Sequence, residues 1–218
     1  MTTLMSLKQA KRFLSILLKH FGRRRDFYHI VTGPKRETWF NAEAIAALAR
    51  ASSDNLSHDL VFTGENNYRT VLQATKSSLS MICNGDLSKK PDIVGYSPKM
   101  NLIALVVECK LIEKKNEYQV ARDLRILRSQ LERAKRVVPS AIVVGLVFGV
   151  HHIGMPAQPE TFYKWLTNRI ETELPRSSFL PLIGQETIVL VPGLQHIQPL
   201  SGKYNGEVSL GICALVAT

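Results

Sequence analysis

The feature that most constrains this chain is the run Asn101–Lys110, in which an uninterrupted apolar stretch is followed by Glu108, Cys109 and Lys110. Both alternating faces of residues 102–107 are apolar, which indicates a strand buried on both sides. Because side chains alternate along a strand, Glu108 and Lys110 share one face and Cys109 lies on the other. Charged groups in such surroundings need partners, and a metal ion would be one.

The residues before this strand predict a hairpin. Asp92 opens a short apolar stretch, and the turn-forming residues that follow it are Gly95, Pro98 and Asn101. The strand near Asp92 is therefore expected to fold back beside the strand that carries Glu108. This arrangement would place the two carboxylates close together.

The pattern of Pro91-Asp92, a spacer of fifteen residues and then Glu108-Cys109-Lys110 resembles the motif of the PD-(D/E)xK nuclease superfamily. The resemblance covers residues 35–150 and implies an α/β, restriction-endonuclease-like core, in which helices flank a mixed central sheet. It implies that Asp92, Glu108 and the main-chain carbonyl of Cys109 hold Mg²⁺ or Mn²⁺. It also implies that Lys110 orients the attacking water or stabilises the developing negative charge.

In this family an acidic residue from an upstream helix often completes the site. Residues 37–49 have a strong helical pattern, and Glu43 lies near its apolar stripe of Trp39, Phe40, Ala44, Ala47 and Leu48. Glu43 is therefore our choice as the further catalytic residue and metal ligand. Glu37 and Glu65 are the alternatives.

The charge of the chain favours a polyanionic partner, because 28 Lys and Arg residues against 18 Asp and Glu residues give a net charge of +10. Residues 118–138 predict a long amphipathic helix, and its face opposite the apolar stripe carries Arg122, Arg125, Arg133 and Arg136. These residues, together with Arg23, Arg24 and Arg25, are candidates for contacts with phosphate. Gln119 is a further candidate, because the family often has a Gln near the site on this helix.

The rest of the chain predicts one domain with an appended helix. Residues 1–34 are interpreted as a basic helical extension and residues 35–218 as the nuclease-like domain, with a C-terminal helix and strands over 159–216. Helical patterns also cover residues 66–79 and 159–174. Strands are expected at 60–62, 102–112, 141–150, 187–191 and 208–216, with the second and third joined in parallel by the 118–138 helix.

The cysteines, apolar runs and N-terminal charges also bear on where in the cell the protein is expected. The three cysteines are widely spaced, which favours a reducing, cytoplasmic location over a disulfide framework. No apolar run approaches the length of a membrane span, so no membrane partner is expected. The absence of acidic residues before Asp26 makes organellar targeting an alternative.

Two functions of different classes are compatible with these residues. The first is a metal-dependent DNA endonuclease of a restriction, repair or mobile-element type. The second is a non-catalytic nucleic-acid-binding subunit that keeps the nuclease fold. A symmetric homodimer would be the simplest way for such an enzyme to cut both strands of a duplex.

Overall fold

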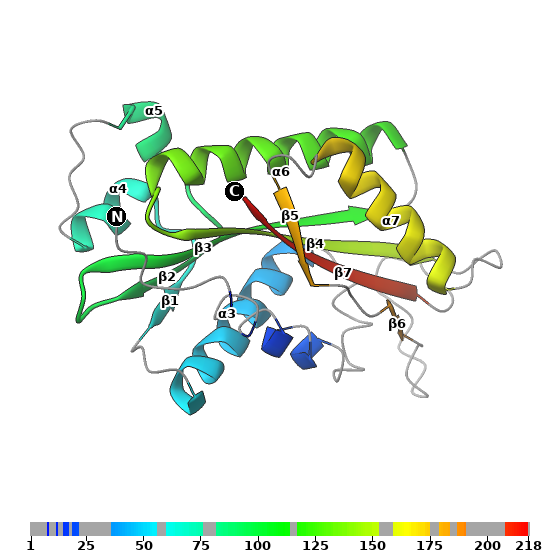
Figure 1. Cartoon of the computed structure of the whole chain (residues 1–218), viewed down its shortest axis with the longest axis horizontal. Helices are drawn as coiled ribbons and strands as arrows, with labels where there is room; N and C mark the ends of the chain where they lie inside the picture. The colour runs from blue at the N-terminus through cyan, green and yellow to red at the C-terminus, as the bar shows by residue number, and fades with distance from the viewer. Residues whose placement is uncertain are drawn as a thin grey trace.

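The computed structural model describes residues 8, 12, 15–17, 19–21, 36–55, 60–75, 82–113, 117–152, 159–174, 179–183, 187–190 and 208–217. Within these ranges a mixed seven-stranded sheet has helices on both faces, which confirms the α/β class (Figure 1). The strands are β1 (Val61–Thr63), β2 (Ile93–Ser97), β3 (Leu102–Glu113), β4 (Ile142–His152), β5 (Phe179–Ile183), β6 (Thr187–Leu190) and β7 (Val208–Ala217). The helices are α3 (Arg36–Asn55), α4 (Tyr68–Ala74), α5 (Asn84–Leu87), α6 (Glu117–Val137) and α7 (Pro159–Glu173).

Strands β2 and β3 form the predicted hairpin. They pair in an antiparallel manner, and Asn101 takes a left-handed conformation (φ 49°) in the turn between them. The pairing ends where Ile93 lies opposite Val107, whereas β3 continues to Glu113. The edge of β3 that carries Glu108 therefore extends past the end of β2.

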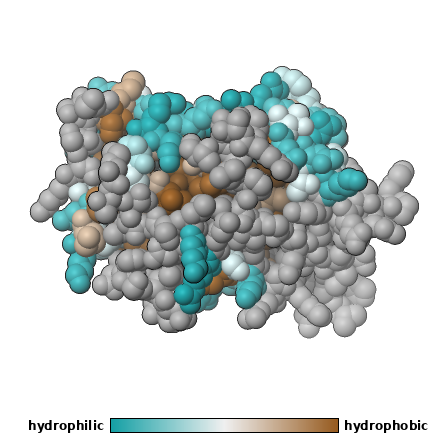
Figure 2. Space-filling model, viewed as in Figure 1, coloured by the Kyte–Doolittle hydropathy of each residue, from teal (hydrophilic) through white to brown (hydrophobic). Residues whose placement is uncertain are grey.

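The unit β3–α6–β4 joins two parallel strands, as predicted. Their pairing runs from Leu105 opposite Ile142 to Glu113 opposite Val150. Helix α6 covers one face of the sheet through a buried stripe of Val120, Leu124, Leu127, Leu131, Ala134 and Val137. Hydrophilic side chains gather along the upper edge of Figure 2, over the outer face of this helix.

Helix α3 packs on the opposite face of the sheet. Phe40 is fully buried there, and its ring stacks on that of Phe148 from β4 with the centroids 4.3 Å apart. Trp39 was expected to face the core, but it is 56% exposed. One residue turns an α-helix by about 100°, which places Trp39 outside the buried stripe of Phe40, Ala44, Ala47 and Leu48.

Two residues of the expected N-terminal extension belong to this same core. Leu17 and Phe21 are fully buried, and the Phe21 ring lies 5.6 Å from that of Phe40 and 5.2 Å from that of Phe148. The described part of residues 1–34 thus packs on the domain. The boundary at residue 34 stays a prediction.

The C-terminal strands extend the sheet beyond β4. Strand β7 pairs antiparallel with β4, and both β5 and β6 pair with the other edge of β7. The sequence predicted β6 and β7 but not β5. Pro181 interrupts β5, and a proline is tolerated because this strand pairs on one side only in the described sheet. None of the described helices is long and apolar enough to cross a membrane.

Candidate functional site

Asp92 lies directly before β2, and both of its carboxylate oxygens are held. The main-chain N–H of Cys109 donates to Oδ2 at 2.7 Å, and Asn41 Nδ2 on α3 donates to Oδ1 at 3.1 Å. The side chain thus bonds the edge of β3 at the point where the pairing with β2 has ended. Burial raises the pKa of Asp92, and the Cys109 N–H opposes that rise.

Glu108 is the most deeply placed acid in the part of the chain described. It is 2% exposed, and its Oε1 accepts a hydrogen bond of 3.3 Å from the Tyr68 hydroxyl on α4. Its Oε2 is buried and makes no well-formed hydrogen bond within the described ranges. Burial, together with the nearby Asp92 carboxylate, raises the pKa of Glu108 to about 8.

The donors at this edge fit a hard divalent cation. The buried Glu108 carboxyl lies near the part-buried Asp92 carboxylate, and one oxygen of Glu108 makes no well-formed hydrogen bond within the described ranges. In an antiparallel ladder, one residue's N–H and C=O point to the same edge, so the Cys109 carbonyl faces the Asp92 side. The described residues include no group of three His, Cys, Asp or Glu side chains that could hold an ion. Two carboxylates, a carbonyl and water are a donor set that suits Mg²⁺.

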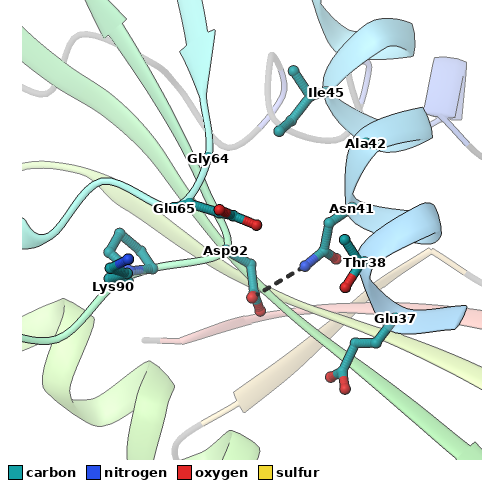
Figure 3. Close-up of a pocket in the computed structure, with 10 residues that line it drawn as sticks. Glu37, Thr38, Asn41, Ala42, Ile45, Gly64, Glu65, Lys90 and Asp92 are labelled. Atoms are coloured by element: carbon teal, nitrogen blue, oxygen red, sulfur yellow. Dashed lines mark hydrogen bonds between the residues drawn. The ribbon is translucent and has the colours of Figure 1, made fainter. Parts of the chain in front are cut away.

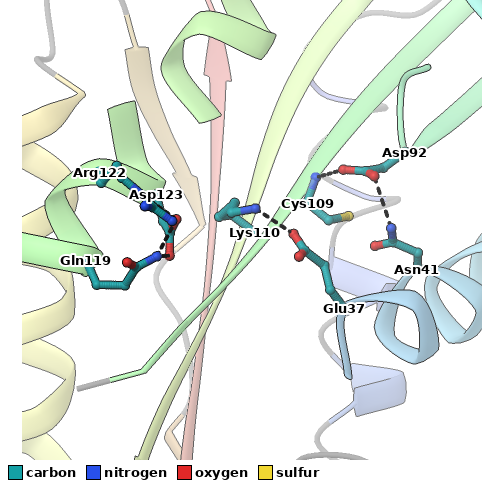
Figure 4. Close-up of polar contacts among 8 residues, drawn as sticks. All are labelled: Glu37, Asn41, Asp92, Cys109, Lys110, Gln119, Arg122 and Asp123. Carbon is teal, nitrogen blue, oxygen red and sulfur yellow. Dashed lines mark hydrogen bonds and ion pairs between the residues drawn. The ribbon is translucent and has the colours of Figure 1, made fainter. Parts of the chain in front are cut away.

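Lys110 reaches this site from the next position on the Glu108 face. Its Nζ donates to Glu37 Oε1 of α3 at 3.1 Å, and its side chain is only 18% exposed (Figure 4). The ammonium lowers the pKa of Asp92 whereas the Glu37 carboxylate raises it, so both charges lie near Asp92. The structure therefore gathers Asp92, Glu108 and Lys110, as the sequence predicted.

The upstream acid differs from our sequence-based choice. Glu43 Oε2 lies 3.0 Å from His20 Nε2, whereas Glu37 is the acid that contacts Lys110. Glu43 follows Asn41 by two residues, or about 200° around the helix, and so faces away from the Asn41–Asp92 contact. The role of Glu43 as catalytic residue and metal ligand stays a prediction, but the acid of α3 that the structure places beside Lys110 is Glu37, one of the two alternatives.

A cavity of about 670 Å³ opens beside Asp92, between α3 and the segments that flank β1 and β2 (Figure 3). It is lined by Glu37, Thr38, Asn41, Ala42, Ile45, Gly64, Glu65, Lys90, Pro91 and Asp92. Glu65, the second alternative, faces this cavity from a left-handed conformation (φ 62°). A Cβ on Gly64 would lie 2.9 Å from the Asp92 carbonyl oxygen, so only glycine allows this close packing.

The predicted phosphate-binding arginines divide into two groups. Arg122 and Arg125 are exposed on the N-terminal half of α6, and Arg125 Nε lies 3.7 Å from Glu173 of α7. Because α6 covers the face opposite α3, these two side chains lie away from the cavity that α3 lines. Arg133 and Arg136 instead pair with Asp86 of α5.

The remaining predicted contacts have other surroundings. Gln119 Nε2 donates to both carboxylate oxygens of Asp123, at 3.0 and 2.9 Å. Arg23, Arg24 and Arg25 lie outside the described residues. Their role in phosphate binding stays a prediction.

Sequence reasoning missed the two side chains that hold the acids. Tyr68 lies in the helix predicted over residues 66–79 and was not among the predicted site residues, but it is 1% exposed and hydrogen-bonded to Glu108. Asn41 was not among the predicted site residues, although it lies four residues after Glu37 and so on the same side of α3. That spacing was the one available signal. No family model, curated protein or solved structure matches this chain.

Proposed function

We propose that this protein is a Mg²⁺- or Mn²⁺-dependent endonuclease with a restriction-endonuclease-like fold, which hydrolyses phosphodiester bonds in DNA. The observation that carries the proposal is the buried Glu108 carboxyl, whose Oε2 has no well-formed hydrogen bond and which lies beside Asp92. A buried acid beside a second, part-buried one is unfavourable in its charged form unless a proton or a cation compensates the charge. A divalent cation does so and also provides one common route to phosphodiester hydrolysis.

Asp92, Glu108 and the Cys109 carbonyl would hold the ion. When bound, the ion supplies Lewis-acid polarisation of the phosphoryl oxygen and lowers the pKa of bound water. Asn41 and the Cys109 N–H orient Asp92, while the Tyr68 hydroxyl orients Glu108.

Lys110 supplies the positive charge on the protein side. Without substrate its ammonium pairs with Glu37, which keeps it at the site. A phosphate in the cavity would accept a hydrogen bond from the same ammonium, and the negative charge that develops during hydrolysis would strengthen that bond.

The second candidate is a non-catalytic nucleic-acid-binding subunit. A surface that only binds a polyanion gains nothing from Asp92, Glu108 and Glu37 beside it, because carboxylates repel phosphate. Glu37 and Asp92 line a cavity and Glu108 lies near Asp92, which favours the enzyme. A DNA partner and a homodimer remain predictions.

The test is a cleavage assay on labelled duplex, branched and single-stranded DNA and on RNA, with Mg²⁺, with Mn²⁺ and with chelator. We expect metal-dependent cleavage of at least one DNA substrate. Metal-independent cleavage would reject the assignment. Binding without cleavage of any substrate would favour the second candidate.

Glu37→Gln is expected to reduce the cleavage rate by about 10- to 100-fold, because Lys110 loses the carboxylate that positions it. Glu43→Gln removes the same charge from the same helix. Because Glu43 contacts His20 rather than Lys110, the cleavage rate of this variant should stay within about twofold of wild type. Single-turnover rates at saturating Mg²⁺ compare the two variants. The reverse order would restore Glu43 as the upstream acid.

A further inference from the structure

We propose that the nucleic acid lies across a basic surface made by α4, α5, the loop before β2 and the C-terminal half of α6. This α4–α5 surface consists of Arg69, Lys89, Lys90, Arg133 and Arg136. The inference rests on the proposed function, since it locates where the phosphate backbone of the substrate binds. It also replaces the N-terminal half of α6 as the binding face.

The surface begins at the cavity. Lys90 lines the cavity together with Asp92, and Lys89 precedes it in the same loop. The main-chain N–H of Tyr68 donates to the Lys89 carbonyl oxygen at 3.0 Å, which attaches this loop to the first turn of α4. Both lysine side chains are exposed there.

From α4 the surface continues across α5 to α6. Arg69 Nη2 donates to Asn84 Oδ1 at 3.0 Å, which joins α4 to α5. Arg133 Nε and Arg136 Nη2 lie 3.1 and 3.5 Å from the two oxygens of Asp86, which joins α5 to α6. Two guanidinium groups share that single carboxylate, so the junction keeps a net positive charge.

The charges of this surface differ from those on the N-terminal half of α6. Residues 66–75 and 82–91 contain three basic side chains and one acid, Asp86. On α6, by contrast, Arg122, Arg125 and Arg128 each lie within 4 Å of a separate carboxylate, on Asp123, Glu173 and Glu132 respectively. Their field is therefore largely cancelled, whereas the α4–α5 surface stays available to phosphate.

The position of the surface agrees with the site. In Figure 1 α4, α5 and the C-terminal end of α6 gather at the same end of the molecule as β1, whereas the N-terminal end of α6 lies beside α7. Tyr68 on α4 also contacts Glu108 directly. A backbone bound on α4 and α5 would thus pass the edge of β3 that carries the acids.

The surface chemistry favours nucleic acid over a lipid membrane. The large exposed hydrophobic side chains in the described ranges are Trp39, Val61, Met100, Tyr118 and Ile126. None of them lies on α4, on α5 or in the loop before β2. A membrane-binding surface normally adds apolar side chains that insert between lipids, and these segments offer none that is large and exposed.

The test compares two triple variants that remove the same charge from the full-length protein. Arg69→Gln/Lys89→Gln/Lys90→Gln changes the α4–α5 surface, and Arg122→Gln/Arg125→Gln/Arg128→Gln changes the outer face of α6. Binding to a fluorescent DNA duplex, its single strand and an RNA duplex is measured by anisotropy in chelator, so that cleavage plays no part. We expect the first triple to lose on the order of 10²-fold in affinity at 0.1 M salt, and the slope of log K against log salt to fall by about 3.

The control triple should bind within about twofold of wild type. Equal losses in both triples, or none in the first, would overturn the proposal. So would a loss of binding to anionic phosphatidylserine vesicles without a loss of nucleic-acid binding. The pair Lys89→Gln/Lys90→Gln repeats the test without removing the Arg69–Asn84 hydrogen bond.

The binding assay tests the α4–α5 surface separately from the proposed cleavage activity. A protein that cleaves no substrate but loses affinity in the first triple would keep the surface and reject the enzyme. A protein that cleaves with metal but binds normally in the first triple would keep the enzyme and reject the surface.

Discussion

Glu108→Gln is expected to abolish metal-dependent cleavage and, at the same time, to stabilise the metal-free protein. The substitution removes a carboxylate that we propose binds the metal, which should cost on the order of 10³-fold or more in rate. It also removes a buried acid whose pKa is raised to about 8, mainly by burial. At pH 7 the folded protein must take up a proton at Glu108, whereas a neutral amide needs none, so the free energy of unfolding should rise by on the order of 3 kcal/mol.

The two effects are measured separately, by single-turnover cleavage with Mg²⁺ and by urea unfolding in chelator. Glu132→Gln is the matched control, because Glu132 is an exposed acid on α6 that pairs with Arg128. Its cleavage rate should stay near that of wild type. Its free energy of unfolding should stay within about 0.5 kcal/mol of the wild-type value. A Glu108→Gln variant that cleaves normally would contradict the metal site. A Glu108→Gln variant that loses stability in chelator would contradict the free-energy cost attributed to burying the acid.

The central part of the fold could be predicted because its sequence patterns favour one structure. A short apolar run of both parities, bounded by turn residues, favours a strand buried on both faces, and the turn residues before it favour the hairpin. From that register alone Asp92, Glu108 and Lys110 are brought to one edge, as observed. The parallel β3–α6–β4 unit follows equally from a long amphipathic helix between two apolar strands.

The acid of α3 that lies beside Lys110 could not be predicted for a geometric reason. The apolar stripe of α3 shows that Phe40 faces the sheet, but Glu37 and Glu43 lie on opposite flanks of that stripe. Which flank meets the Asp92 loop depends on how the helix crosses the sheet, and no pattern within the helix carries that information. Tyr68 was missed for a similar reason, because the partner of its hydroxyl is forty residues away in the sequence.

Divalent cations are expected to stabilise the protein more strongly as the pH rises from 5 to 8. The pKa of Glu108 is 4.5 in its unperturbed state and about 8 in the folded protein. The folded protein thus binds this proton more tightly than the unfolded chain does. The stability that Glu108 contributes is fully present below pH 4.5 and is lost as the pH rises towards 8. Asp92, whose pKa is also raised, changes stability in the same direction.

A bound cation should reverse this loss, because it replaces the proton as the compensating positive charge. Melting temperatures in chelator should therefore fall between pH 5 and pH 8, and saturating Mn²⁺ or Mg²⁺ should restore them. At a metal concentration of 100 times Kd the gain is about 2.7 kcal/mol. Glu108→Gln should show a smaller fall in chelator and little response to metal, whereas Glu43→Gln should behave as wild type. An equal metal response in all three proteins would place the ion somewhere other than between Asp92 and Glu108.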